Sequence, residues 1–228
     1  VAIDTPDADR ILAEADALGW RITQVWNTHW HRDHAGGNER LKAATGCRIV
    51  APAGEKGRIP AVDLTVGEGD LVEAGGLEAV VLETPGHTLG HVCYHLPEIG
   101  VAFVGDTLFA LGCGRLFEGS ADQMWRSLSR LASLPDDTVV YCAHEYTAAN
   151  ARFALSLEPD HARLRAYADR VAALRAAGRP TVPTTIGAER LANPFLRADD
   201  PDLQRRMGHP GDPVSTFAAI RAGKDVFR

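Results

Sequence analysis

The stretch NTHWHRDHAGGN, residues 27–38, places three imidazoles and one carboxylate within six residues. These side chains are His29, His31, Asp33 and His34. On a helix, residues two apart lie about 200° apart around the axis, so His29 and His31 could not share a metal ion there. On an extended segment the two rings point to the same side. We therefore expect His29 and His31 to bind one ion, and Asp33 and His34 to reach a second.

The surroundings of this motif predict a loop that leaves a strand. The β-type run ITQVW, residues 22–26, precedes the motif, and Gly36 and Gly37 lie at its end. Proteins of the α/β class commonly place their functional sites on loops at the carboxyl ends of strands. A metal site is therefore expected at such a strand end.

Three further ligand-type residues also follow predicted strands. His87 lies in TPGHTLGH, Asp106 in GDTLF and His144 in YCAHEY. A carboxylate has two oxygens, so Asp106 is the natural bridge between two ions. His91, four residues after His87, is the rival ligand. The two predicted ligand sets are His29, His31, His87 and Asp106 for one ion, and Asp33, His34, His144 and Asp106 for the other.

Imidazole and carboxylate ligands without thiolate favour zinc, with iron or manganese as alternatives. Two divalent ions carry four positive charges, and the carboxylates of Asp33 and Asp106 cancel only half of them. The pKa of a water between the ions should fall from about 15.7 toward roughly 7, which makes it a nucleophile at neutral pH. Asp33 could accept the proton that remains after attack. The same nucleophile could attack an ester, a lactam, a phosphodiester or a thioester. The leaving group gives weak support to a thioester, because a thiolate leaves without a strong general acid.

The composition points to a small substrate. The chain of 228 residues is 45% hydrophobic and 24% charged, which is typical of a soluble globular protein. Its formal net charge of −6 disfavours nucleic acid and anionic membrane surfaces as partners. No apolar run approaches the roughly 20 residues that cross a bilayer, and the four cysteines form no C-x-x-C pair. We expect a cytoplasmic monomer with buried cysteines.

Helical and strand-like segments alternate up to about residue 145. Thr5 is the predicted cap of a first helix. Residues 38–45 should form another helix, and residues 48–51 a strand. Ser120, with Gln123 three residues later, predicts a capping box at the start of a longer helix. Beyond Tyr146 the chain is rich in Ala, Arg and Leu at helical spacing, notably in residues 160–177 and 213–224, which predicts a separate helical subdomain.

The segments THWHRDHAGGN, TPGHT, GDTLF and AHEYT, in this order, resemble the metallo-β-lactamase superfamily and, more narrowly, the hydroxyacylglutathione hydrolases (glyoxalase II). The resemblance implies a four-layered αββα sandwich of the α/β (α+β) class for residues 1–145. It implies a helical glutathione-binding domain for residues 146–228. Because the family begins with strands that this chain lacks before Val1, we expect the natural protein to start earlier. Trp30 replaces a histidine that is not a ligand in the family.

The resemblance also implies an activity and its substrate contacts. The family hydrolyses S-(2-hydroxyacyl)glutathione, typically S-D-lactoylglutathione, to glutathione and D-lactate, the second step of methylglyoxal detoxification. Arg115 matches its basic residue after GDTLF, and Phe117 stands where a tyrosine is usual, which removes one hydroxyl contact. Tyr146 matches the tyrosine of AHEYT. Arg221 and Lys224 in IRAGKD match the pair that holds the glycine carboxylate, and on a helix they share one face.

Other functions remain as alternatives. A persulfide dioxygenase of the same superfamily uses one iron held by two histidines and an aspartate. The C-terminal R-x-x-K pattern argues against that enzyme and against a lactamase or lactonase. A non-catalytic scaffold with this fold would have lost metal ligands, whereas all seven predicted ligands are present.

Overall fold

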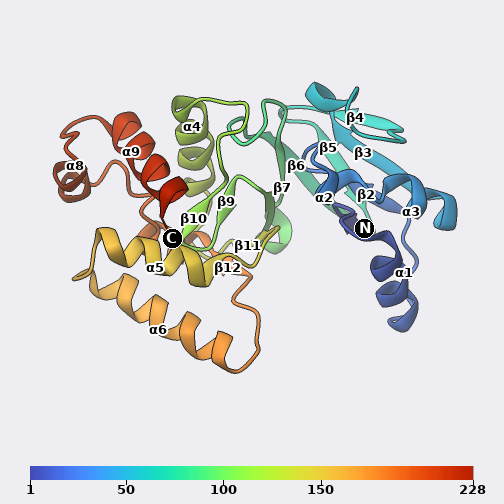
Figure 1. Cartoon of the computed structure of the whole chain (residues 1–228). Coiled ribbons are helices and arrows are strands. Elements are labelled where there is room, and N and C mark those ends of the chain that lie inside the picture. The colour runs from blue at the N-terminus through green and yellow to red at the C-terminus, as the bar shows by residue number, and fades with distance from the viewer. Residues whose placement is uncertain (228) are drawn as a thin grey trace. The chain divides into compact units, whose positions relative to one another are not determined.

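The parallel strands that precede the opening motif lie in the first of two units in this computed structural model, which describes residues 1–227 (Figure 1). One unit consists of Val1–Glu83 with Thr88–Ile99, and the other of Thr84–His87 with the chain from Gly100 onward. The expected boundary between residues 145 and 146 falls inside the second unit. The division into a catalytic and a helical domain therefore remains a prediction.

The first unit contains a parallel sheet with the strand order β1-β2-β3-β4. Its strands are β1 (Ala2–Ile3), β2 (Gln24–Trp26), β3 (Arg48–Pro52) and β4 (Leu64–Val66). Val25 and Ile49 are fully buried, as expected for strands of a parallel sheet. They form one apolar cluster with residues of the helices α1 (Ala8–Ala17) and α3 (Asn38–Thr45). The predicted helix at 38–45 and the strand that follows it are confirmed.

The start of α1 differs from its prediction. Asp7, rather than Thr5, caps the helix, and its Oδ1 accepts a hydrogen bond from the backbone N–H of Arg10 at 3.1 Å. Thr5 is buried, and its hydroxyl donates to Oδ1 of Asn38 at 2.7 Å. The prediction was wrong because packing against the start of α3 occupies this hydroxyl. Gly37 is required here, since a Cβ on it would lie 2.7 Å from the carbonyl oxygen of Thr5.

Antiparallel strands complete the first unit. They are β5 (Leu71–Ala74), β6 (Leu77–Glu83) and β7 (Val92–Leu96), and β6 pairs with both of its neighbours. Two single turns of 3₁₀ helix, Ala53–Glu55 and Pro97–Ile99, accompany them. The short β runs predicted between residues 64 and 83 are thus confirmed.

The second unit contains three strands of a six-stranded sheet and most of the helices. In its sheet β8 (Val101–Gly105) pairs in parallel with β11 (Val139–Cys142), which pairs antiparallel with β12 (Thr184–Thr185). A separate two-stranded ribbon joins β9 (Leu108–Phe109) to β10 (Gly112–Cys113). The helices are α4 (Ala121–Ala132), α5 (Thr147–Leu157), α6 (Ala162–Ala176), α7 (Ile186–Ala192), α8 (Pro201–Met207) and α9 (Pro213–Val226).

The helix predictions for this unit are confirmed. The hydroxyl of Ser120 accepts from the backbone N–H of Gln123, whose side chain accepts from the backbone of Ser120, so the capping box at α4 is present. The predicted segments 160–177 and 213–224 correspond to α6 and α9. The C-terminal part of the described chain is therefore largely helical.

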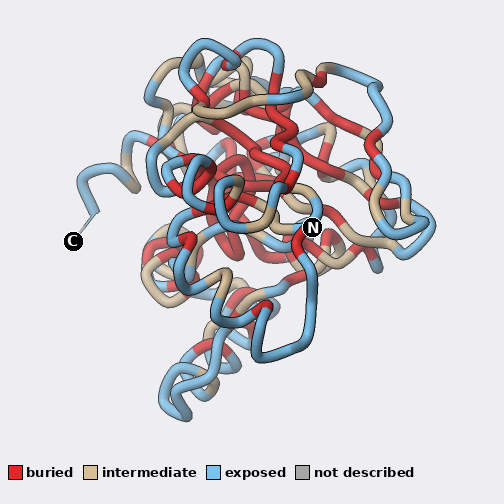
Figure 2. The backbone as a smooth tube through the Cα atoms, turned by 90° about the vertical axis from the view of Figure 1, so that its right-hand side faces the viewer, coloured by how far each residue is buried: buried red, intermediate tan, exposed pale blue. Residues whose placement is uncertain are grey.

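Buried residues concentrate on the strands and on the inner faces of the helices (Figure 2). All four cysteines are free thiols, of which Cys47, Cys93 and Cys113 are buried and Cys142 is partly buried. Burial raises the pKa of the Cys113 and Cys142 thiols to about 11, so both are protonated at neutral pH. Among residues 1–227, no helix is both long and apolar enough to span a bilayer.

Candidate metal centre

The predicted ligands His29 and His31 follow strand β2, as the sequence indicates. His29 is fully buried, and its Nδ1 lies 3.0 Å from the hydroxyl of Thr28. Its other ring nitrogen, Nε2, lies 2.9 Å from Nδ1 of His31. The non-helical segment between β2 and residue 32 therefore brings two ligand-type nitrogens together, as required for a shared ion.

Asp33 and His34 lie on a single helical turn, α2 (Arg32–Ala35), where the sequence predicted a loop. The turn forms because the backbone N–H groups of His34 and Ala35 both bond to the carbonyl of His31. It buries the His34 ring and leaves Asp33 exposed, with Nε2 of His34 3.8 Å from Oδ2 of Asp33. These two side chains are therefore neighbours, as predicted.

Asp4 holds His34 in place, a role that the sequence pattern did not indicate. Its Oδ2 lies 2.7 Å from Nδ1 of His34, and its two oxygens accept bonds of 2.8 Å from the backbone N–H and the hydroxyl of Thr28. The pairing of β1 with β2 sets this position, since Ile3 lies opposite Trp26. A carboxylate on the second ring nitrogen fixes the tautomer of a metal-binding histidine.

Replacing Asp4 with alanine should weaken zinc binding by about 10- to 100-fold, the usual effect of losing a partner of a ligand histidine. The His34 ring would lose its orientation, and Nδ1 would lose its acceptor. Titration of the metal-free protein against a chromophoric zinc chelator measures this change. Asp9→Ala is the matched control, because Asp9 pairs with Arg40 on the surface. Unchanged zinc affinity in Asp4→Ala would exclude His34 as a ligand oriented by Asp4.

His87, Asp106 and His144 converge in the second unit. Because β8 and β11 are parallel and Cys142 lies opposite Gly105, Asp106 and His144 leave the sheet at the same edge. Oδ2 of Asp106 lies 3.4 Å from Nε2 of His87, and Oδ1 lies 3.4 Å from Nε2 of His144. Each oxygen of this buried carboxylate thus faces a different imidazole, which suits a bridging ligand.

The chain after Asp106 folds back tightly on this group. Nδ1 of His87 lies 2.9 Å from the carbonyl oxygen of Arg115, so its Nε2 is the nitrogen left for a metal ion. Gly114 has no room for a side chain, since a Cβ would lie 1.9 Å from the carbonyl oxygen of Asp106. His29, His34 and His87 therefore each place one ring nitrogen against an oxygen, a donor set that fits a divalent metal ion.

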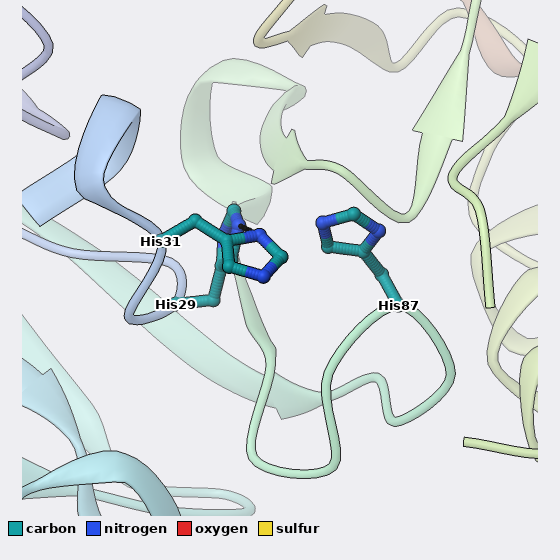
Figure 3. A group of neighbouring side chains, drawn as sticks. All are labelled: His29, His31 and His87. Carbon is teal, nitrogen blue, oxygen red and sulfur yellow. Dashed lines mark hydrogen bonds between the residues drawn. The ribbon is translucent and has the colours of Figure 1, made fainter. Parts of the chain in front are cut away.

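Ligand-type atoms from the predicted residues form three groups, in each of which all atoms lie within 4.8 Å of one another. One group contains the histidines drawn in Figure 3. Two of the groups each draw on one predicted ligand set, whereas the third combines Asp106 with one histidine of each set. The assignment to individual ions stays a prediction. The groups are His29, His31 and His87; His29, His34 and Asp106; and Asp33, His34 and His144.

Two neighbours of these residues have other roles. The rival ligand His91 is fully buried, and its ring stacks on that of His29 at 5.0 Å between centroids. It belongs to none of the groups of potential ligands found among the described residues. Trp30 packs edge-on against the His31 ring. The guanidinium carbon of Arg58 lies 3.4 Å from the centroid of the Trp30 ring. Both support the ligand segment by packing.

The predicted substrate residues near the metal ligands are exposed. Phe117 lies 5.2 Å from the ring of His87, and Tyr146 stacks on His144 at 4.9 Å, with 60% and 49% of their surfaces exposed. The Arg115 side chain is also exposed, with Nε 3.9 Å from Oδ1 of Asp225. These three side chains can meet a ligand without rearrangement of the core.

Arg221 and Lys224, the predicted carboxylate pair on α9, differ in their surroundings. Arg221 is only 5% exposed and donates to the carbonyl of Cys113 and to Oδ1 of Asp225, both at 2.9 Å. Lys224 is partly exposed. Burial, followed by the charges of Arg221, Arg152 and Arg115, lowers its pKa from the ordinary 10.5. Lys224 therefore belongs to a cationic region, whereas both terminal nitrogens of Arg221 already donate to groups of the protein.

Comparisons with known proteins identify the family of this chain. Residues 4–144 match the model of the metallo-beta-lactamase superfamily, and residues 145–227 match that of the hydroxyacylglutathione hydrolase C-terminus. A hydroxyacylglutathione hydrolase of Maricaulis maris (strain MCS10) is 62% identical over 226 residues, which cover 99% of this chain and 88% of the relative. The predicted metallo-β-lactamase fold class is confirmed.

Solved structures show the same fold. ETHE1 from Myxococcus xanthus has a TM-score of 0.70 and 28% identity, over 99% of this chain and 80% of its own. TTHA1623, solved in a di-iron-bound form, has a TM-score of 0.61 and 26% identity, over 85% of this chain and 88% of its own. Taken with the two family models, these findings show that the chain belongs to the metallo-beta-lactamase superfamily and, within it, to the hydroxyacylglutathione hydrolases.

Proposed function

We propose that this protein hydrolyses S-(2-hydroxyacyl)glutathione thioesters, such as S-D-lactoylglutathione, to glutathione and a 2-hydroxy acid. The observation that supports this substrate is family membership over the whole chain, including the C-terminal match at residues 145–227. The proposed reaction would be the second step of methylglyoxal detoxification. We also propose that it acts as a cytoplasmic monomer.

The residues present suit two divalent ions, and we propose zinc, with iron or manganese as the alternatives. Such ions, when bound, acidify water and polarise a carbonyl. Asp106 would contribute to both sites through its two oxygens. The ligand sets that we propose are His29, His31, His87 and Asp106 at one ion, and Asp33, His34, His144 and Asp106 at the other.

The protein side chains would contribute to the attack on the thioester in two ways. Asp33, whose side chain is 62% exposed beside His34, is the proposed acceptor for the proton lost by the attacking water. Phe117 and Tyr146 flank His87 and His144 and are placed to position the acyl group and the sulfur. The thiolate of glutathione, with a thiol pKa of about 8.5, departs without an acid catalyst.

A direct assay tests this proposal. The purified protein, loaded with zinc, should cleave the thioester of S-D-lactoylglutathione, and a chelator should abolish this cleavage. Absence of chelator-sensitive cleavage would exclude the proposed function. A persulfide dioxygenase would instead consume oxygen in the presence of glutathione persulfide and hold one iron.

The cationic region around Lys224 predicts a pH dependence of glutathione binding. Because the pKa of Lys224 is lowered below 10.5, this side chain should lose its charge at a lower pH than an ordinary lysine. Its attraction for the glycine carboxylate should therefore be complete below the lowered pKa and decline as the pH rises through it. Competitive inhibition by an S-alkyl glutathione, measured from pH 7 upward, reports this decline.

Lys224→Arg is the control, because a guanidinium stays charged over the whole pH range. This variant should bind the inhibitor with an affinity that no longer falls in that window. An identical pH profile in the wild type and in Lys224→Arg would assign the titration to another group.

A further inference from the structure

The turn between β9 and β10 is held by side chains from helices far along the chain. The amide of Asn193, just after α7, donates to the carbonyl oxygens of Phe109 at 3.2 Å and Gly112 at 3.0 Å. The amide of Asn150 on α5 donates to the carbonyl of Ala110 at 3.1 Å. Three backbone carbonyls of the turn thus accept hydrogen bonds from buried side-chain amides.

Glu189 on α7 anchors the same turn from a fully buried position. Its Oε2 accepts from the backbone N–H of Leu111 at 2.7 Å and from the amide of Asn193 at 2.9 Å. Its Oε1 accepts from the hydroxyls of Tyr167 at 2.8 Å and Thr184 at 2.7 Å. One carboxylate oxygen therefore faces the turn, and the other faces α6 and β12.

The conformation of Leu111 explains why the turn needs such support. Leu111 is fully buried with a φ of +57°, a left-handed backbone conformation that is unfavourable for a residue with a side chain. The hydrogen bond from its N–H to Glu189 offsets this cost. Removing the acceptor would leave a buried N–H unsatisfied in a strained turn.

The turn lies within the segment that touches all three predicted ligands of the second unit. Asp106 begins this segment, and the carbonyl of Arg115 at its end meets Nδ1 of His87. Phe109 packs edge-on against the ring of His144 at 5.9 Å and that of Tyr146 at 5.4 Å. Movement of the turn would therefore displace His144 and loosen the contacts around Asp106 and His87.

We propose that Glu189 and Asn193 are positioning residues for the metal centre, acting through the Phe109–Gly112 turn. This inference rests on the proposed metal-dependent function. Within residues 1–227, the hydrogen bonds of their side chains go to groups other than the predicted ligands. Their hydrogen bonds fix the turn to helix α7 and the residue that follows it. The fixed turn then keeps His87, Asp106 and His144 in a geometry suited to a metal ion.

A pair of single substitutions on the two sides of Glu189 tests the proposal. Asn193→Leu removes the amide that holds the turn, whereas Tyr167→Phe removes a hydroxyl bonded to the far oxygen of the same carboxylate. Zinc affinity, measured against a chromophoric chelator, should fall about 10- to 100-fold in Asn193→Leu. Zinc affinity should stay at the wild-type value in Tyr167→Phe, even if this substitution lowers the thermal midpoint as much as Asn193→Leu does.

Glu189→Gln provides a rescue. Its amide oxygen can accept from Leu111 and Asn193, while its NH₂ group donates to hydroxyls that can rotate. Because burial raises the pKa of Glu189, a neutral amide is a mild replacement, and zinc affinity should remain near that of the wild type. Glu189→Leu should lower it as Asn193→Leu does.

The outcomes separate this inference from the proposed function. Wild-type zinc affinity in Asn193→Leu, or an equal loss in Tyr167→Phe, would overturn the positioning role and leave the proposed hydrolase intact. A wild-type protein that binds no divalent metal would overturn both. If Asn193→Leu does not fold, Asn150→Ala removes another bond to the turn and carries the same expectation.

Discussion

Replacing Asp106 with asparagine is expected to reduce the metal content from two ions to one or fewer and to lower kcat by more than about 100-fold. The estimate follows because loss of a partner of a ligand already costs about 10- to 100-fold, and Asp106 is a predicted ligand itself. Its two oxygens lie 3.4 Å from Nε2 of His87 and from Nε2 of His144. An asparagine keeps one oxygen and presents an NH₂ group, which cannot bind a cation, to the other side.

Metal analysis of the purified variant, together with its rate on S-D-lactoylglutathione, gives the readout. Asp136→Asn is the matched control, because this carboxylate pairs with Arg190 on the surface at 2.7 Å. The control should keep both the metal content and kcat of the wild type. Two tightly bound ions and near-normal kcat in Asp106→Asn would show that another group bridges the ions.

The ligand pattern was predictable because its chemistry is local. His29, His31, Asp33 and His34 are close in sequence, and the β runs before Asp106 and His144 place those residues at strand ends whatever the details of packing. The parallel pairing of β8 with β11 then brings the last two together. Within residues 27–38, the one-turn helix α2 escaped prediction, since four residues are too few for a helical pattern in the sequence.

The supporting residues could not be predicted in the same way. Asp4 is hydrogen-bonded to His34, 30 residues away in the sequence, and Asn193 to Phe109, 84 residues away. An isolated Asp or Asn carries no spacing signal, and its role depends on tertiary pairing. The same limit explains the error at Thr5, whose favourable capping chemistry was overridden by its contact with Asn38. Helical spacing placed Arg221 and Lys224 on one face of α9 but gave no information on their burial.

The difference in burial between Arg221 and Lys224 leads to different expected effects of removing each. Lys224→Ala should raise KM for the glutathione thioester about 10-fold. This change corresponds to roughly 1.4 kcal/mol of binding free energy, the contribution of one charged hydrogen bond. The kcat and the thermal midpoint should stay unchanged. Arg221→Ala removes a buried cation whose bond to the Cys113 carbonyl holds the chain just before Arg115. The free energy of unfolding should fall by about 2 kcal/mol, which lowers the thermal midpoint by about 4–8 °C.

Arg221→Ala should also lower kcat, because the segment that it anchors ends at the carbonyl bonded to His87. Steady-state kinetics and thermal unfolding of both variants, with the exposed Arg206→Ala as a charge-matched control, distinguish the two roles. A rise in KM alone, with no loss of stability, would instead make Arg221 a direct ligand of the glycine carboxylate. In that case the carboxylate would bind through N–H groups of the guanidinium other than the two that donate to the Cys113 carbonyl and to Asp225.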